Sequence, residues 1–309
     1  MIEEEVTFAS VGTRLAGTLA MPDSAGPFPA VLLLPGSGQV DRNESHRRMP
    51  INALREIGHH LAARGFASFR YDKRGVGASG GDYWSTGFFD NATDALAALE
   101  FLKSQAAAEE DQVFLLGHSE GAHIATRLAG EGADVAGVVL LAGAARRGEE
   151  TLKWQARKVA ASLTGIPRLL VRMFRINIVR SQQKQLDKIK RSGRDWYRVQ
   201  IVGRLNAKWM REFMGYDPAP DLARIRVPVL AITGSKDIQV APVDLKKMAM
   251  LVRGPIEYHE LPDGTHLLRV EEGAPTLSSY KKQVREPVDA RVLKLVSDWL
   301  ESRVATPVG

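Results

Sequence analysis

The fold of this chain is decided by one stretch, residues 113–121, which read VFLLGHSEG. An apolar run leads into the pattern G-x-S-x-G, in which Gly117 and Gly121 flank Ser119, and a helical pattern follows from Ala122. A nucleophile on a sharp turn between a strand and a helix needs small neighbours, because the backbone there is strained and crowded. This context makes Ser119 the candidate nucleophile.

Apolar runs typical of buried parallel strands lie on both sides of this stretch, at residues 30–34, 135–141 and 228–234, and further strand candidates lie at residues 66–71 and 256–261. Helical patterns alternate with them, at residues 51–65, 92–102 and 243–251 and from Pro287 onward. Residues 4–9 and 13–20, around Gly12, have the pattern of a hairpin. Alternation of strands and helices predicts an α/β fold with a mostly parallel, doubly wound sheet.

The alternation is interrupted by a basic segment with a helical pattern. Residues 146–226 contain 20 Lys and Arg against 7 Asp and Glu, whereas the rest of the chain contains 22 against 29. We therefore expect a core made of residues 1–143 and 223–309, with residues 144–222 inserted between two strands as a helical cap.

Within this insertion one predicted helix is amphipathic. Arg168, Arg172 and Arg175 share one face, and the opposite face consists of Ile166, Leu169, Leu170, Met173 and Phe174. The favoured interpretation is a lid helix with its apolar face on the site and its charges in water. Contact with an anionic membrane surface is the alternative. Nucleic acid is not an expected partner, because no nucleic-acid-binding motif is present.

The composition excludes several kinds of chemistry. The chain has no cysteine, so disulfides, thiolate metal sites and cysteine nucleophiles are impossible. The N-terminus, MIEEEVTF, is acidic where a signal peptide is basic, and no apolar stretch approaches the ~20 residues that span a bilayer. These features predict a soluble, cytoplasmic protein.

A serine nucleophile needs a general base, and the base needs an acid that orients it. Among seven histidines, His266 lies in a turn-rich loop after the last predicted strand, where ligands gather in open α/β sheets. Asp237 follows the preceding strand, and the order Ser119, Asp237, His266, serine then acid then histidine, is the one expected when the nucleophile lies on a strand-to-helix elbow. Asp244, in a predicted helix, and Asp263, in a Pro-Asp-Gly turn, are the alternative acids.

An acyl-transfer site also needs N–H donors for a developing oxyanion. The N–H of Glu120 is one candidate, because Glu120 begins the helix after the nucleophile. The second donor is expected in the glycine-rich loop after residues 30–34, from Ser37, Gly38 or Gln39, and all three remain open.

No cofactor or metal is predicted. The segment Gly75–Gly80 matches G-x-G-x-x-G, but a loop-like segment follows it where a dinucleotide site requires a helix.

Five segments together resemble the α/β-hydrolase superfamily and, more narrowly, capped bacterial serine esterases of the carboxylesterase and aminopeptidase-like group. They are residues 32–42, 71–79, 117–121, 233–237 and 263–268. The resemblance implies Ser119 as nucleophile, Asp237 as acid and His266 as base. One departure is Pro35-Gly36, where many relatives have His-Gly.

The function predicted from these residues is hydrolysis of small-molecule carboxylic esters through a Ser-His-Asp triad and an acyl-enzyme. A thioesterase or serine aminopeptidase with the same triad is the alternative among enzymes. The alternative from another class is a non-catalytic binding protein on a hydrolase scaffold, with the basic cap as its interaction surface.

Overall fold

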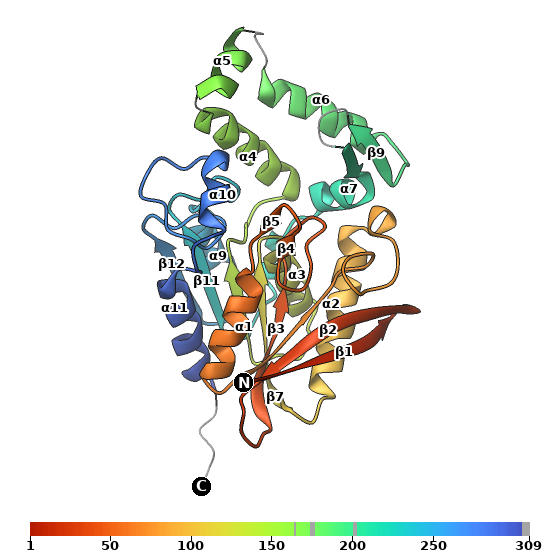
Figure 1. Cartoon of the computed structure of the whole chain (residues 1–309), viewed down its shortest axis with the longest axis vertical. Coiled ribbons are helices and arrows are strands. Elements are labelled where there is room, and N and C mark those ends of the chain that lie inside the picture. Colours follow the sequence, from red (N-terminus) through yellow and green to blue (C-terminus); the bar gives the residue numbers. More distant parts are fainter. Residues whose placement is uncertain (164, 174–176, 200–202, 305–309) are drawn as a thin grey trace.

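An eight-stranded sheet forms the centre of the molecule, as Figure 1 shows. The structure is a computed structural model that describes residues 1–163, 165–173, 177–199 and 203–304. Its strand order is β1-β2-β6-β3-β7-β8-β11-β12. The strands are β1 (Ile2–Ser10), β2 (Thr13–Met21), β3 (Phe28–Leu34), β6 (Ala67–Tyr71), β7 (Ala108–His118), β8 (Gly137–Leu141), β11 (Val229–Gly234) and β12 (Ile256–Leu261). Neighbours from β6 to β12 are parallel, and β1–β2 and β2–β6 are antiparallel. The predicted α/β architecture is confirmed.

Helices cover both faces of the sheet. They are α1 (Ala53–Ala63), α2 (Phe88–Lys103), α3 (Glu120–Gly130), α9 (Asp244–Leu251) and α11 (Ala290–Glu301). Strand β3 shows why continuous apolar runs form the central strands: Leu32 packs in the core beneath α2 and α3, whereas Leu33 packs in the core beneath α1 and α11. Both side chains are completely buried, so both faces of the strand must be apolar.

Several element boundaries differ from the sequence prediction, most of them by a few residues. The last helix begins at Ala290 and not at Pro287, because the Asp289 side chain accepts the N–H of Arg291 and caps the helix there. Strand β7 begins at Ala108, before the apolar run that predicted it. The remaining short elements are β4 (Ser45–His46), β5 (Met49–Pro50), η1 (Tyr83–Ser85), η2 (Leu277–Ser279) and α10 (Tyr280–Gln283).

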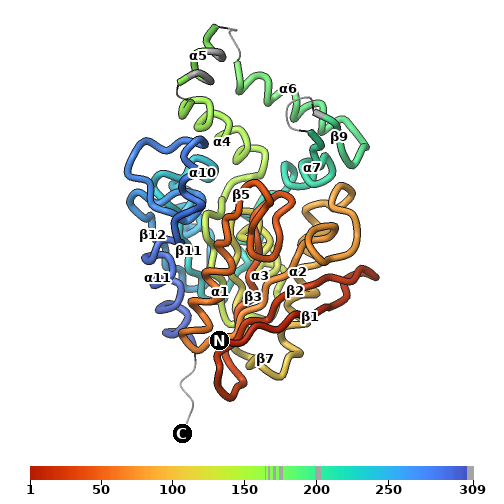
Figure 2. Tube along the Cα trace, in the orientation of Figure 1, coloured from red at the N-terminus to blue at the C-terminus, as the bar shows by residue number. Residues whose placement is uncertain are grey.

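The segment between β8 and β11 leaves the sheet and extends beyond it (Figures 1 and 2). It contains α4 (Gly148–Ser162), α5 (Gly165–Met173), α6 (Ile178–Lys190), α7 (Ala207–Gly215) and α8 (Ala219–Leu222). It also contains an antiparallel pair, β9 (Trp196–Val199) and β10 (Gly203–Asn206), so the prediction of an all-helical insertion was wrong. The run Trp-Tyr-Arg-Val in β9 combines aromatic and β-branched residues, which favour strands.

Helix α5 lies at the outer end of this segment in both views. Leu169 and Met173 are 63% and 60% exposed, so these two side chains of the expected apolar face do not pack over the site. Arg168 and Arg172 are exposed as well, and Arg175 and Phe174 lie outside the described residues. The side chains of Ile166 and Leu170 also lie outside the described part of the chain. No described helix is both long and apolar enough to cross a membrane.

Candidate active site

Ser119 occupies a sharp turn between β7 and α3, as the sequence predicts. Its φ of 54° is left-handed, a conformation that costs a residue other than glycine roughly 1–3 kcal/mol. The flanking glycines are required by close packing. A Cβ on Gly117 would lie 2.1 Å from the carbonyl oxygen of Gly121, and a Cβ on Gly121 would lie 2.0 Å from that of Leu34. The strained turn is therefore held between strand and helix without room for side chains.

His266 bridges Ser119 and Asp237. Its Nε2 lies 3.1 Å from Ser119 Oγ, and its Nδ1 lies 2.8 Å from Asp237 Oδ2. The other Asp237 oxygen accepts the N–H groups of Gln239 and Val240 at 2.7 and 2.8 Å, which fixes the carboxylate. Because Asp237 accepts a hydrogen bond from the Nδ1–H group of His266, the proton stays on Nδ1 and Nε2 is free to accept the proton of the Ser119 hydroxyl. The three residues follow β7, β11 and β12, at the carboxyl ends of parallel strands.

The two alternative acids lie elsewhere. Asp244 accepts a hydrogen bond of 2.8 Å from Nε of Arg146, a residue at the start of the inserted segment. Asp263 pairs with Lys236 at 2.7 Å. Neither of these carboxylates bonds to His266 in the described structure, so Asp237 alone among the three candidates contacts the imidazole.

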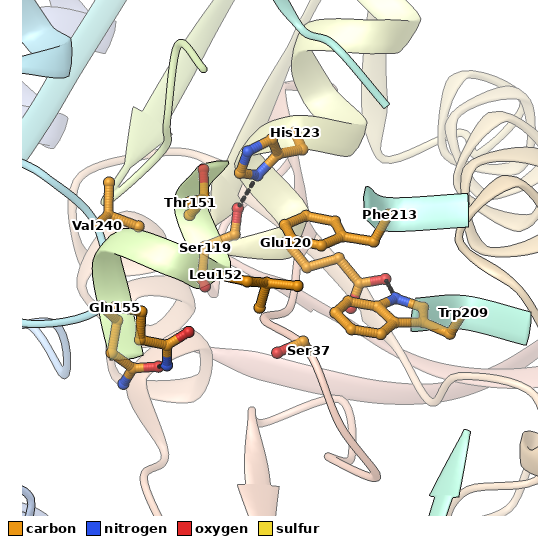
Figure 3. Close-up of a pocket in the computed structure, with 11 residues that line it drawn as sticks. Ser37, Ser119, Glu120, His123, Thr151, Leu152, Gln155, Trp209, Phe213 and Val240 are labelled. Atoms are coloured by element: carbon orange, nitrogen blue, oxygen red, sulfur yellow. Dashed lines mark hydrogen bonds between the residues drawn. The ribbon is translucent and has the colours of Figure 1, made fainter. Parts of the chain in front are cut away.

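A cavity of about 60 Å³ opens beside Ser119 (Figure 3). Ser37 and Glu120 line it, together with residues of α4 and α7. Gly38 and Gln39 line a different hollow, of about 280 Å³, to which Ser37 also contributes. Of the three loop residues that the sequence leaves open, Ser37 is therefore the one beside the candidate nucleophile.

The side chain of Glu120 is buried and fully engaged. Its carboxylate accepts hydrogen bonds from Lys73 Nζ at 2.7 Å, Asn91 Nδ2 at 2.8 Å and Trp209 Nε1 at 2.6 Å. Lys73 compensates its charge, and Trp209, on α7, connects the inserted segment to the turn at Ser119 (Figure 3). The sequence could not predict these three hydrogen bonds, because Lys73, Asn91 and Trp209 lie far from Glu120 along the chain and no local pattern connects them to it.

Two further histidines lie next to the nucleophile. His123 is buried, and its Nδ1 lies 3.0 Å from the Ser119 carbonyl oxygen. Burial lowers its pKa, so the ring is neutral and Nδ1 donates. His118 bonds to Glu44 and to the backbone of His266. Burial opposes its protonation, but the field and hydrogen bond of Glu44, the hydrogen bond to the His266 carbonyl and the field of Asp237 together outweigh that effect and raise the His118 pKa. Glu44 was not among the residues predicted from the sequence.

Comparison with known proteins bears on this site. Residues 49–273 match the family model described as serine aminopeptidase, S33. The esterase EstD of Thermotoga maritima is 29% identical over 290 residues, which cover 93% of this chain and 65% of that protein. The present chain thus spans slightly less than two thirds of the length of that relative.

Solved structures share the fold at low sequence identity. Est1E from Butyrivibrio proteoclasticus, bound to ferulic acid, has a TM-score of 0.67 at 17% identity, covering 97% of this chain and 100% of that one. The α/β hydrolase GrgF from Penicillium sp. sh18 has a TM-score of 0.67 at 18% identity, covering 99% of this chain and 100% of that one. The α/β-hydrolase fold, predicted from the sequence, is confirmed.

The family match covers most of the chain and includes the strand ends that carry Ser119, Asp237 and His266. It extends through the inserted segment and leaves out only β1 to β4 and the last helices. The chain therefore belongs to the serine aminopeptidase S33 family of α/β hydrolases.

Proposed function

We propose that this protein is a serine hydrolase that cleaves carboxylic esters of small molecules, with Ser119 as nucleophile, His266 as general base and Asp237 as orienting acid. The observation that carries the proposal is the position of the His266 ring, 3.1 Å from Ser119 Oγ and 2.8 Å from Asp237 Oδ2. The likeness to an esterase from Thermotoga maritima supports the same reaction.

The reaction proceeds in two steps. His266 Nε2 accepts the Ser119 proton while Oγ attacks the ester carbonyl carbon. The N–H groups of Glu120 and Ser37 donate to the negative oxygen of the tetrahedral intermediate. His266 returns the proton to the departing alcohol, and the acyl group stays on Ser119. Water then gives a proton to the same imidazole and adds to the acyl carbon. The bond between this carbon and Ser119 Oγ breaks, Oγ takes the proton back from His266, and the carboxylic acid leaves.

The lining of the cavity favours esters over peptides with a free amino terminus. A substrate ammonium needs an acceptor with an uncompensated negative charge. Among the described residues that line the cavity, Glu120 is the single acid, and Lys73, Asn91 and Trp209 already occupy it. A thioesterase reaction would use the same machinery and differs only in the leaving group.

Labelling with a fluorophosphonate probe separates an enzyme from a binding protein on the same scaffold. We expect the probe to label the wild-type protein on Ser119, with p-nitrophenyl acetate hydrolysed by the same preparation. Peptide mapping identifies the labelled residue, and Ser119→Ala serves as the control. A protein that is neither labelled nor active on any of a panel of esters would exclude the proposed function.

The volume of the cavity predicts short acyl groups. A volume of about 60 Å³ is small for a ligand pocket, which suits acetyl or propionyl chains rather than long acyl chains. We expect kcat/KM for p-nitrophenyl acetate to exceed that for the octanoate at least tenfold. Leu152 on α4 lines the cavity (Figure 3), so Leu152→Ala should enlarge it and lower the ratio of kcat/KM for the acetate to kcat/KM for the octanoate. Leu169→Ala, on the exposed α5, is the matched control, and a preference of the wild type for octanoate would contradict the assignment.

We further propose that residues 144–222 act as a cap over the site. The support is that α4 and α7 both contribute side chains to the cavity, as the labelled residues of Figure 3 illustrate. Contact with an anionic membrane surface through the exposed arginines of α5 stays a prediction. Co-sedimentation with vesicles of anionic lipid tests it. The expected cytoplasmic location also stays a prediction.

A further inference from the structure

Next to the proposed triad lies a second carboxylate–histidine pair that the mechanism above does not use. Glu44 and His118 are each 2% exposed. His118 Nδ1 lies 2.6 Å from Glu44 Oε1, and His118 Nε2 lies 2.8 Å from the carbonyl oxygen of His266. One imidazole ring therefore connects a buried acid to the backbone of the residue that would serve as base.

The hydrogen bonds define where the protons are. A carbonyl oxygen only accepts, so His118 Nε2 must carry a hydrogen that it donates to His266. The Nδ1 atom faces a carboxylate oxygen that also accepts the N–H of Gly36, at 2.6 Å. With a proton on Nδ1 as well, the ring is an imidazolium and each of its nitrogens has an acceptor. The raised pKa of His118 agrees with this charged form.

Glu44 also holds the loop that would supply the second oxyanion donor. Its Oε1 accepts the N–H of Gly36, and Lys73 Nζ donates to the carbonyl oxygen of Gly36 at 2.6 Å. The peptide groups on both sides of Gly36 are thus fixed immediately before Ser37. A Cβ at Gly36 would lie 2.6 Å from Glu44 Oε1, so this contact requires glycine.

The geometry of Glu44 is unfavourable for stability alone. Its φ of 64° is left-handed, which is strained for a residue other than glycine. Its Oε2 is buried and has no hydrogen-bond partner among the described residues, while Oε1 serves two donors. Backbone strain and a buried oxygen without a partner are typical of functional sites and not of side chains that only pack.

We propose that Glu44 and His118 form a buried carboxylate–imidazolium pair that positions the Ser37 loop and the backbone of His266 around Ser119. The inference rests on the proposed function, in which Ser37 donates to the oxyanion and His266 acts as base. Glu44 is then a positioning residue, because it reaches the reacting atoms only through Gly36 and His118. A displacement of ~1 Å in either loop can cost ~100-fold in rate.

The first test is kinetic. Glu44→Gln keeps the size of the side chain but removes its charge, and we expect kcat for p-nitrophenyl acetate to fall about 10- to 100-fold with little change in KM. His118→Asn should have a similar effect, and the double variant should be no worse than either single one. Asp94→Asn is the matched control, because it breaks a buried ion pair with Arg74, at 2.6 Å, that does not contact the triad.

The second test reads the pair directly and does not depend on activity. Nitrogen-15 spectra of histidine-labelled wild-type protein should show both ring nitrogens of His118 protonated at pH 7, above the ~6.5 at which a free imidazole titrates, with the signal assigned through its loss in His118→Asn. In Glu44→Gln the same ring should carry one proton. A neutral His118 ring in the wild type would overturn the proposal, as would Glu44→Gln with kcat within threefold of wild type. Absence of hydrolysis by the wild type would instead overturn the proposed function.

Thermal stability supplies a third readout, with a defined pH dependence. A raised folded-state pKa means that the His118 charge stabilises the protein fully below the unfolded pKa of ~6.5, and that this contribution is lost as pH rises through the folded pKa. The Tm difference between wild type and Glu44→Gln should therefore be larger at pH 6 than at pH 9. The other titratable groups close to the pair are Asp237 and His266, near His118, and Arg269, near Glu44, and the substitution leaves all three in place. A Tm difference between wild type and Glu44→Gln that increases with pH would contradict the proposal of a charged pair.

Discussion

Ser119→Ala should lower kcat for ester hydrolysis by roughly 10,000-fold or more, because it removes the atom that forms the acyl-enzyme. His266→Ala should cost a similar factor, since without its Nε2, 3.1 Å from Ser119 Oγ, no group accepts the serine proton. The two residues act as one unit, so the double variant should be little worse than either single variant.

Steady-state rates on p-nitrophenyl acetate measure these effects, and circular dichroism checks that each variant is folded. Neither substitution should change KM greatly, because both residues act on the transition state more than on the bound ester. Activity within tenfold of wild type for either single variant would rule out the assignment of nucleophile and base.

Asp237→Asn should reduce kcat by about 1,000- to 10,000-fold while the site keeps its shape. The amide no longer stabilises the imidazolium that forms during reaction, and its NH₂ group favours the wrong tautomer of His266. The amide oxygen of Asn can still accept the N–H groups of Gln239 and Val240, so the loop that holds residue 237 keeps its position.

Asp244→Asn is the matched comparison, because Asp244 is an equally buried carboxylate that follows β11. It pairs with Arg146 and does not contact His266. Its replacement should therefore lower the free energy of unfolding and have little effect on kcat. A larger loss of kcat in Asp244→Asn than in Asp237→Asn would show that Asp237 is not the orienting acid.

The strands and helices of the core could be predicted because their signals are local. Continuous apolar runs mark strands buried on both faces, as Leu32 and Leu33 of β3 illustrate. The inserted segment was predicted less well. Its basic helical composition conceals the β9–β10 pair, and α5 exposes Leu169 and Met173, although its pattern predicts a packed face. An amphipathic pattern identifies a helix but does not identify what the helix packs against.

The sequence by itself determined the α/β-hydrolase fold and the short set of residues from which a catalytic site could be built. Strand periodicity, the glycines around Ser119 and the loop positions of Asp237, Asp244 and His266 are all visible within a few residues of chain. Tertiary structure alone decided which of these groups meet.

The physical reason is that a hydrogen-bonded pair depends on neighbouring strand ends and not on distance along the chain. The order β7-β8-β11-β12 brings together residues 147 positions apart, Ser119 and His266. The same packing joins Glu44 to His118 across 74 positions, although neither residue carries a local pattern that announces the other. Such contacts form only once the strands have paired, because pairing brings the loops at the carboxyl ends of neighbouring strands together.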